Sequence, residues 1–313
     1  MSLHYKYTIT MIIKVISPRG YCKGVVRAIN IAKKARIDYP EKDIFILGMI
    51  VHNTYVTKAL ERLNIITIDH KGKTREELLD YIDHGVVVFT AHGIDNNTKI
   101  KATSKGLITI DASCVDVIKT QDSINSRIEA GYSIIYIGTK NHPEAMAVLS
   151  DHTNISLVTK YEDIELLNIN NDKIFITNQT TMSIKEIEQI YKSLKVKYPN
   201  AIIEEEICNA TRLRQEALIN HSHLDLLYVV GDHLSNNSNK LKDIGKAHCA
   251  DKVLLIETNQ DININDLKGI NSIGITSGAS TPTYLTNQVI EVLQHYEATN
   301  TLIKKSIELD KII

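Results

Sequence analysis

Three cysteines occupy the same local context along this chain. They are Cys22 in PRGYCKGVVRAI, Cys114 in DASCVDVIKT and Cys208 in EICNATRLRQEA, each after a short apolar run and before a helical pattern. They recur about every ninety residues, as three related modules would produce. A thiol at a helix N-terminus meets unpaired backbone N–H groups and the positive end of the helix dipole, which favour the thiolate. Three thiolates in one place would repel one another without a cation, so the pattern predicts a metal centre.

The residue pattern leaves the kind of centre open. Structural zinc takes four protein ligands, commonly in paired spacings such as CxxC, and no such pair occurs in this sequence. The fourth cysteine, Cys249 in GKAHCADKV, breaks the pattern, and we expect a plain core or surface thiol just before a strand. Three thiolates with one open coordination position remain, on a zinc ion or on an iron–sulfur cluster with three or four irons. The alternative is three unrelated core thiols placed by chance.

Polar side chains follow several other predicted strands, and in open α/β sheets ligands bind outside the carboxyl ends of the strands. These positions hold imidazoles, hydroxyls and amides: His52, His92, His142, Gln179, Thr180, Thr181, Ser235, Asn236, Asn237 and Ser280. Each alone is equally well explained as a turn or a cap, but together they suit an anion such as phosphate or diphosphate. In SGASTPTYL, Ser280 or Thr281 is expected to cap a helix, with Pro282 in its first turn.

One carboxylate, Glu144, lies beside His142 at the start of the helical segment PEAMAVLSDH. In a pocket shared with an anionic ligand its protonated form is favoured, so it could act as a general acid, with Thr180 relaying or orienting the proton. The alternative is an exposed glutamate at a helix N-terminus, stabilised there by the helix dipole. Pro143 disfavours helical geometry at His142, so the helix is expected to start after it.

The elements that must position these side chains are short β-branched runs alternating with helical patterns, which indicates an α/β protein with largely parallel sheets. The predicted strands are Ile12–Ile16, Ile44–Leu47, Val86–Thr90, Ile108–Asp111, Ile134–Ile137, Ile174–Thr177, Ala201–Glu205, Leu226–Val230, Val253–Ile256 and Ser272–Thr276. The repeat predicts three similar α/β domains around a common axis. We expect them at residues 19–113, 114–206 and 207–294 with strand 11–18. They are followed by a C-terminal tail at 295–313, which we interpret as a terminal helix.

Composition narrows the class of protein. The chain has 313 residues, 43% of them apolar and 23% charged, with a formal net charge of −1. This balance gives no general reason to expect a nucleic-acid or membrane partner, and no apolar window reaches the roughly 18 residues that span a bilayer. The start does not resemble a signal peptide, and residues 1–10 are interpreted either as an extension or as the result of a wrongly assigned start codon. Four cysteines without a secretory signal predict cytoplasmic thiols.

The chain resembles the 4-hydroxy-3-methylbut-2-enyl diphosphate reductases, the last enzymes of the methylerythritol phosphate route to isoprenoids. The similarity is carried, in order, by PRGYCKGVVRAI, VHNTYV, AHG, DASCVDVIKT, GTKNHPE, NQTTMS, EICNATRLRQEA, VVGDHLSNNSNKL and GITSGASTP, over about residues 12–293. The resemblance implies a trefoil of three α/β domains around a [4Fe–4S] cluster held by Cys22, Cys114 and Cys208, with one iron open to the substrate's hydroxyl oxygen.

The same resemblance implies roles for the polar residues. It assigns the substrate's diphosphate to His52, His92, His142, Thr180, Ser235, Asn236, Asn237 and Ser280, and proton donation to Glu144 with Thr180 beside it. Electrons would come one at a time from a ferredoxin or flavodoxin-type carrier. The chain departs from the family pattern at Val115, usually proline, at Asn236, often serine, and after HPE. Two alternative functions are a three-cysteine zinc hydrolase of a phosphorylated substrate and a non-catalytic iron–sulfur sensor.

Overall fold

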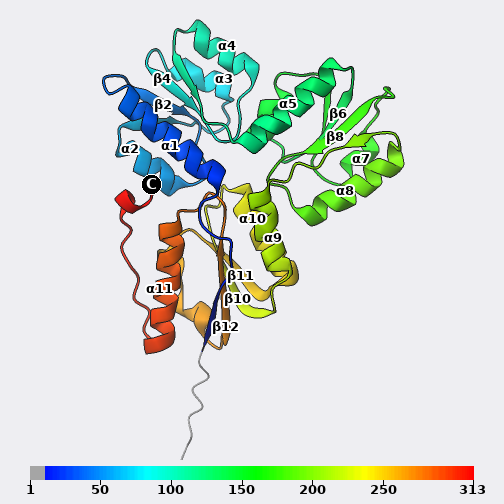
Figure 1. Ribbon diagram of the computed structural model, residues 1–313. Coiled ribbons are helices and arrows are strands. Elements are labelled where there is room, and N and C mark those ends of the chain that lie inside the picture. Colours follow the sequence, from blue (N-terminus) through cyan, green and yellow to red (C-terminus); the bar gives the residue numbers. More distant parts are fainter. Residues whose placement is uncertain (1–10) are drawn as a thin grey trace, which may run out of the picture. The chain divides into compact units, whose positions relative to one another are not determined.

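The chain folds into three parallel β-sheets of four strands each (Figure 1). The computed structural model describes residues 11–313, and the predicted extension at residues 1–10 lies outside the described residues. The strands are β1 (Ile12–Val15), β2 (Ile44–Leu47), β3 (Ile65–Ile68), β4 (Val86–Phe89), β5 (Ile108–Asp111), β6 (Ser133–Ile137), β7 (Ile155–Val158), β8 (Ile174–Asn178), β9 (Ile202–Ile203), β10 (Leu224–Val230), β11 (Ala250–Ile256) and β12 (Ser272–Ser277). The predicted α/β class is confirmed.

All three sheets share one strand order. The first runs β3-β2-β4-β5, the second β7-β6-β8-β9, and the third β11-β10-β12-β1. In each sheet we number the four strands of the module in chain order, counting β1 as the last strand of the third module. The second strand then lies at one edge, the first and the third lie in the middle, and the last strand forms the other edge. In the third sheet this closing strand is β1, from the start of the chain, paired in parallel with β12. The cysteine repeat therefore reflects a repeated fold.

The first sheet is covered by helices on both faces. They are α1 (Lys23–Asp38), α2 (Thr54–Glu61), α3 (Arg75–Leu78), the 3₁₀ turn η1 (Leu79–Tyr81) and α4 (Asn96–Ser104). Successive side chains of a strand point to opposite faces, so Leu47 and Phe89 pack with Leu78, Leu79 and Ala102 on the side of α3 and α4. Figure 1 shows α1 and α2 on the other side of this sheet. Burial on both faces explains the continuous apolar run of β4.

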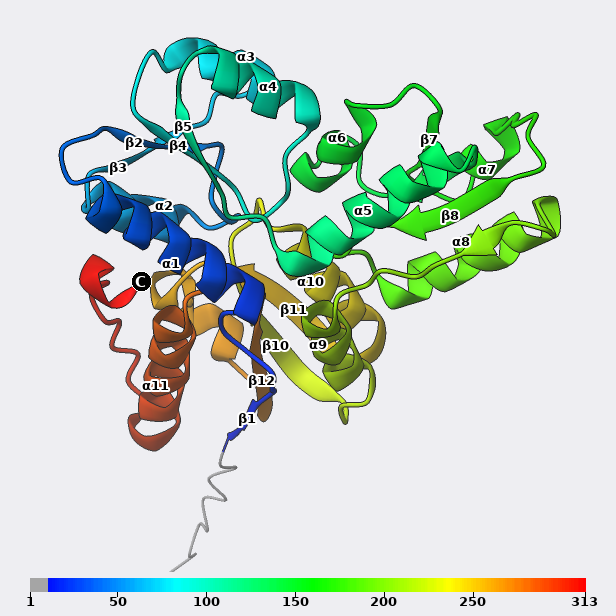
Figure 2. The ribbon, with the colours of Figure 1, turned by 45° about the horizontal axis from the view of Figure 1, so that its top comes forward.

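The second sheet has the same layered arrangement, which Figure 2 shows most openly. Its helices are α5 (Val115–Glu129), α6 (Pro143–Leu149), α7 (Asp163–Leu166) and α8 (Ile184–Lys197). Ile124 of α5 and Ala145 of α6 pack with Tyr136 and Phe175 on one face. The opposite face packs against α7 and α8, through residues such as Ile187.

The third sheet carries α10 (Asn236–His248) and α11 (Thr283–Thr299), with α9 (Asn209–Ile219) leading into it and the 3₁₀ turns η2 (Asn259–Asp261), η3 (Ile264–Leu267) and η4 (Leu309–Lys311) nearby in sequence. Leu227 and Val229 face a cluster that contains Leu241 of α10. Tyr228 and Val230 face the cluster that contains Leu293 of α11. None of the helices within residues 11–313 is both long and apolar enough to cross a membrane.

Contacts divide the chain into two compact units. One unit contains residues 11–21 and 213–312, and hence the third sheet, while the other contains residues 22–212 with the first and second sheets. The finer division into three domains with the boundaries given above stays a prediction. We describe the two units separately and call them the third-sheet unit and the two-sheet unit.

All ten predicted strands overlap an observed strand, although the expected strand at Ala201–Glu205 is reduced to the two residues of β9. Two strands, β3 and β7, were not predicted; both lie at sheet edges and are only partly buried. At the other end, α11 continues to Thr299, where Asn300 adopts a left-handed conformation with φ 54°. The segment beyond it is extended and ends in η4, so the predicted terminal helix is wrong over most of residues 295–313.

Candidate active site

The three repeated cysteines lie in equivalent positions of the fold. Each follows the closing strand of a sheet, β1, β5 or β9, and directly precedes a helix, α1, α5 or α9. Cys22 is the N-cap of α1, and its sulfur accepts a hydrogen bond from the Val25 N–H at 3.4 Å. Cys114 is the N-cap of α5, and the Cys208 thiol donates to Thr211 Oγ1 at 3.1 Å. All three belong to the two-sheet unit, are half-buried and form no disulfide.

A glycine in the first turn of α1 makes room for two of these thiols. A β-carbon placed on Gly24 would lie 2.7 Å from Cys114 Sγ and 3.8 Å from Cys22 Sγ. The two sulfurs therefore face the same small space, and any side chain at position 24 would enter it. Cys208 is close enough for the charge of Cys22 to raise its pKa. The side chains of Cys22 and Cys114 thus approach one another in this unit, and the joint role of all three cysteines as ligands stays a prediction.

The protonation of the thiols differs from the expectation drawn from helix N-termini. Burial raises the pKa of the Cys114 thiol to about 11, and the charges of Asp116 and Cys22 add to this, against hydrogen bonds from the backbone. Burial likewise raises the pKa of Cys208, although Thr211 opposes the shift. Desolvation outweighs the helix termini, so thiolates at these positions need a bound cation.

The arrangement of the cysteine thiols indicates which metal centre they could hold. A zinc ion bound by thiolates needs each sulfur about 2.3 Å away. Within residues 11–313, no three His, Cys, Asp or Glu side chains stand close enough together to ligate one metal ion. Cys22 and Cys114 share a space without a third ligand at the same point, and this spacing suits an iron–sulfur cluster, in which each cysteine binds its own iron. The residues therefore fit a cluster better than a single zinc ion.

Three imidazoles form a second group in the same unit. His52 follows β2, His92 follows β4, and His142 follows β6. The ring centroids of His52 and His92 lie 4.2 Å apart, and His142 lies 5.3 Å from His52 and 5.7 Å from His92. Ends of strands from two different sheets thus bring together side chains far apart in the sequence. We call these residues the imidazole cluster.

Two members of the imidazole cluster, His92 and His142, favour the neutral form. Burial lowers the pKa of His142 to about 3, and the charges of His52 and Arg75 add to this shift. Burial also lowers the pKa of His92 well below its usual value, again with contributions from the other imidazoles and Arg75. His142 Nδ1 accepts the Glu144 N–H at 3.2 Å, which leaves the ring proton on Nε2. That N–H is available to donate to an anion.

Arg75 is a residue that the sequence reasoning missed. It lies on α3, and its guanidinium donates to the Leu47 carbonyl at the end of β2. It lines a cavity of about 560 Å³ together with His52. Burial lowers its pKa to about 10, so it remains charged at neutral pH. The local sequence KTREEL reads only as the start of an exposed helix with Thr74 as its cap, and it gives no signal for a buried cation.

Glu144 lies inside the protein, 3% exposed, which makes the alternative of an exposed glutamate wrong. Its Oε1 accepts the Thr180 N–H at 2.7 Å, and its Oε2 accepts the Thr180 hydroxyl at 3.1 Å. Burial raises the pKa of Glu144 to about 7, while the two hydrogen bonds from Thr180 oppose the shift. The Thr180 carbonyl in turn accepts the Cys208 N–H at 3.1 Å. One residue therefore links a carboxyl group that titrates near neutrality to the third thiol.

The remaining predicted residues lie in the third-sheet unit. Ser235 is the N-cap of α10, and the Ser280 hydroxyl donates to Ser235 Oγ at 3.4 Å. Asn237 Oδ1 accepts the Ala279 N–H at 3.1 Å, which ties the first turn of α10 to the loop after β12. These three residues are buried, and Asn236 beside them is half-buried. They form one polar group at the carboxyl ends of two neighbouring strands.

The predicted cap of α11 is wrong. The helix begins at Thr283 with Pro282 as its N-cap, and no side chain caps it. Thr281 instead donates its hydroxyl to the Val230 carbonyl at 2.9 Å, which holds the loop against β10. Cys249 lies as expected, 1% exposed in the core directly before β11. The predicted site residues are thus divided between the two units, and their assigned roles stay predictions.

Known proteins are similar to this chain along most of its length. The chain matches the family described as LytB protein over residues 13–294. A curated relative from Bacillus cytotoxicus is 45% identical over 304 residues, covering 95% of this chain and 96% of the relative. One from Geobacillus is 46% identical over 285 residues, covering 90% of each. Both relatives are named 4-hydroxy-3-methylbut-2-enyl diphosphate reductase.

Two solved structures are similar over 91% of this chain. The structure of the E-1-hydroxy-2-methyl-but-2-enyl-4-diphosphate reductase from Plasmodium falciparum has a TM-score of 0.83 and 32% identity, with 88% of that chain covered. Another (E)-4-hydroxy-3-methyl-but-2-enyl diphosphate reductase, described as the terminal enzyme of the non-mevalonate pathway, has a TM-score of 0.62 and 25% identity, with 99% covered. With a match along nearly its whole length, this chain belongs to the LytB family and is an oxidoreductase.

Proposed function

We propose that this protein reductively removes the hydroxyl group of (E)-4-hydroxy-3-methylbut-2-enyl diphosphate. The substrate takes up two electrons and two protons, its C–O bond breaks, and water leaves together with isopentenyl diphosphate or dimethylallyl diphosphate. The curated relatives and the solved structures that resemble this chain over most of its length carry this activity in their names.

The observation that carries the proposal is the connection between Glu144, Thr180 and Cys208. A carboxyl group with a pKa of about 7 can hold a proton at neutral pH and release it to a departing oxygen. Thr180 fixes both carboxyl oxygens, and its own carbonyl holds the backbone of Cys208. The proton donor is therefore positioned relative to the thiols by a short path of hydrogen bonds within one unit.

Cys22, Cys114 and Cys208 would hold a [4Fe–4S] cluster. When bound, such a cluster would supply electrons singly and, at an iron without a protein ligand, a Lewis acid for the hydroxyl oxygen. In the two-sheet unit, the imidazole cluster donates to the diphosphate, and Arg75 adds a nearby positive charge. The family resemblance assigns diphosphate binding also to Ser235, Asn236, Asn237 and Ser280 of the third-sheet unit. Fixing the diphosphate holds the hydroxyl carbon in place while Glu144 gives up its proton.

The two alternative functions receive less support. A zinc hydrolase needs three sulfurs around one ion, which the spacing of the thiols does not favour. A non-catalytic sensor has no need of a buried carboxyl group poised near neutral pH. We further propose that ferredoxin or flavodoxin-type carriers supply the electrons. We place the protein in the cytoplasm, a compartment in which free thiols such as these four stay reduced.

The test combines cluster analysis with turnover. Protein purified without oxygen is analysed for iron, sulfide and zinc and by Mössbauer spectroscopy, with and without substrate. We expect iron and sulfide with one distinct iron that responds to substrate, and conversion of the diphosphate by protein supplied with a chemical reductant. Colourless protein with stoichiometric zinc would support the hydrolase, and a cluster-loaded protein without turnover would support the sensor.

A further inference from the structure

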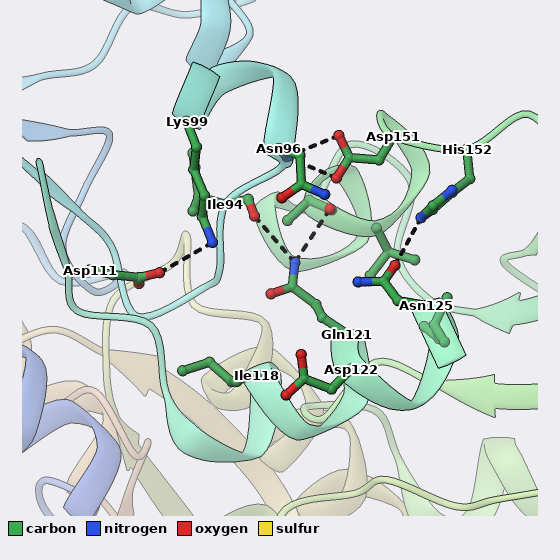
Figure 3. Close-up of a pocket in the computed structure, with 13 residues that line it drawn as sticks. Ile94, Asn96, Lys99, Asp111, Ile118, Gln121, Asp122, Asn125, Asp151 and His152 are labelled. Atoms are coloured by element: carbon green, nitrogen blue, oxygen red, sulfur yellow. Dashed lines mark hydrogen bonds and ion pairs between the residues drawn. The ribbon is translucent and has the colours of Figure 1, made fainter. Parts of the chain in front are cut away.

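A cavity of about 160 Å³ lies between the first and second sheets of the two-sheet unit (Figure 3). Its lining comes from the loop after β4, from α4, from α5 and from the end of α6. None of the predicted site residues lines it. Hydrogen bonds beside this cavity connect elements of the first sheet to helices of the second sheet. The connected segments lie close in sequence to His92 and His142 of the imidazole cluster.

Gln121 of α5 makes the first of these connections. Its Nε2 group donates to the Ile94 carbonyl at 3.4 Å and to the Ala147 carbonyl at 3.3 Å. Ile94 is two residues after His92, and Ala147 belongs to α6, the helix that His142 caps. Ala147 lies in the last turn of α6, where carbonyls lack partners within the helix. One amide therefore spans the segments that carry two of the three imidazoles, as Figure 3 shows for Gln121 and Ile94.

Close packing at Gly93 reinforces this connection. Gly93 has φ +86°, a conformation that residues with side chains rarely adopt. A β-carbon placed there would lie 2.9 Å from Val117 Cγ1 and 3.3 Å from the amide of Gln121. The loop after His92 therefore rests directly on α5, the helix that begins at Cys114.

Asp151 makes the second connection, from the other side of the cavity. Its carboxylate accepts the Asn96 N–H at 2.9 and 2.8 Å and the Asn97 N–H at 3.4 Å. These N–H groups open α4, and Asp151 follows the end of α6. A carboxylate at a helix N-terminus is stabilised by the helix dipole. The hydrogen bonds of Asp151 therefore hold α4 of the first sheet to the end of α6 of the second sheet.

We propose that Gln121 and Asp151 are positioning residues that set the separation between His92 and the pair His142 and Glu144. This inference rests on the proposed function, because it assigns the imidazoles to the diphosphate. Neither residue touches the imidazoles, and both act by holding the loop after β4 against α6. Imidazoles held at a fixed spacing bind a diphosphate more tightly, because less ordering is required on binding.

Gln121→Leu tests the proposal, because leucine fills similar space and donates no hydrogen bond. Asn125→Leu is the matched control. Asn125 lies one turn further along the same helix and lines the same cavity, but its amide oxygen contacts His152 Nε2 at 2.9 Å, within the second sheet's layer alone. Both variants are prepared as full chains with their cluster, and visible absorption and thermal unfolding confirm that each is loaded and folded.

Two measurements decide the outcome. Calorimetry with inorganic diphosphate should give a dissociation constant about fivefold higher for Gln121→Leu, and a value within about twofold of the wild type for Asn125→Leu. Hydrogen–deuterium exchange should rise in residues 92–97 and 143–149 only in Gln121→Leu. The same affinity in the wild type and Gln121→Leu, equal losses in the two variants, or unchanged exchange in those segments would overturn the inference. Failure of the proposed function is visible separately, in a wild type that does not convert its substrate.

Discussion

Removing one hydroxyl group tests the role of Glu144 directly. Thr180→Val keeps the shape of the residue and its N–H bond to Glu144 Oε1, but it removes the hydroxyl bond to Oε2 at 3.1 Å. That hydroxyl stabilises the charged carboxylate, so its loss raises the pKa of Glu144 above its present value of about 7.

The size of the shift follows from the geometry. A hydrogen bond to a charged group contributes about 1.5 to 3 kcal/mol, and the 3.1 Å length places this one toward the weaker end. Since one pKa unit corresponds to about 1.4 kcal/mol, we expect an upward shift of about one unit. A general acid works while protonated, so kcat falls as pH rises through its pKa. In Thr180→Val this fall should move from near pH 7 to about one unit higher.

The assay is kcat as a function of pH, with saturating substrate and a chemical reductant that itself shows no titration in this range. Thr181→Val is the matched control, because the Thr181 hydroxyl accepts a hydrogen bond from Gln179, whereas Thr180 donates the two hydrogen bonds to the Glu144 carboxylate described above. Its profile should coincide with that of the wild type. A Thr180→Val profile that falls at the wild-type pH, or a downward shift, would refute the assignment of Glu144 as the proton donor.

Three further predictions concern the thiols and the anion site. Cys114→Ser should lose the cluster and the activity together, and iron analysis that finds a complete cluster would contradict its role as a ligand. Gly24→Ala, which adds a carbon 2.7 Å from Cys114 Sγ, should fold but retain less than about half of the wild-type iron, as measured alongside circular dichroism. Arg75→Met should weaken binding of inorganic diphosphate about tenfold and flatten its salt dependence, because a buried charge near the imidazoles is lost; titration at two ionic strengths checks both.

Much of the fold could be predicted because the strands are buried on both faces. β4 and β6 are runs of β-branched and aromatic residues with no polar alternation, which is typical of central parallel strands. The missed strands, β3 and β7, lie at sheet edges, where partial exposure weakens the apolar signal. The strand β9 was overestimated because its pairing with β8 ends after Glu204, whose N–H still donates to the Ile176 carbonyl at 2.9 Å.

The site was predictable where chemistry depends on residue type, and less so where it depends on packing. Cysteines and imidazoles at strand ends are visible in a sequence, because few structural roles require them there. Arg75 was missed because its importance comes from burial beside His52, and Gln121 because its contacts come from a loop and a helix far away in sequence. The prediction that the helix dipole favours the thiolate was wrong for Cys114. Burial raises the pKa of this thiol, and this effect outweighs that of the helix N-terminus.

Burial has opposite effects on the acids and on the bases of the two-sheet unit, and it shifts both toward their neutral forms. It raises the pKa of Cys114 and Glu144 and lowers the pKa of His92 and His142, so each group favours its neutral form. Arg75 keeps its charge. The negative charge of a bound diphosphate favours protonation of the imidazoles and of Glu144 alike. The substrate's charge therefore helps to keep the proposed acid protonated until the C–O bond breaks.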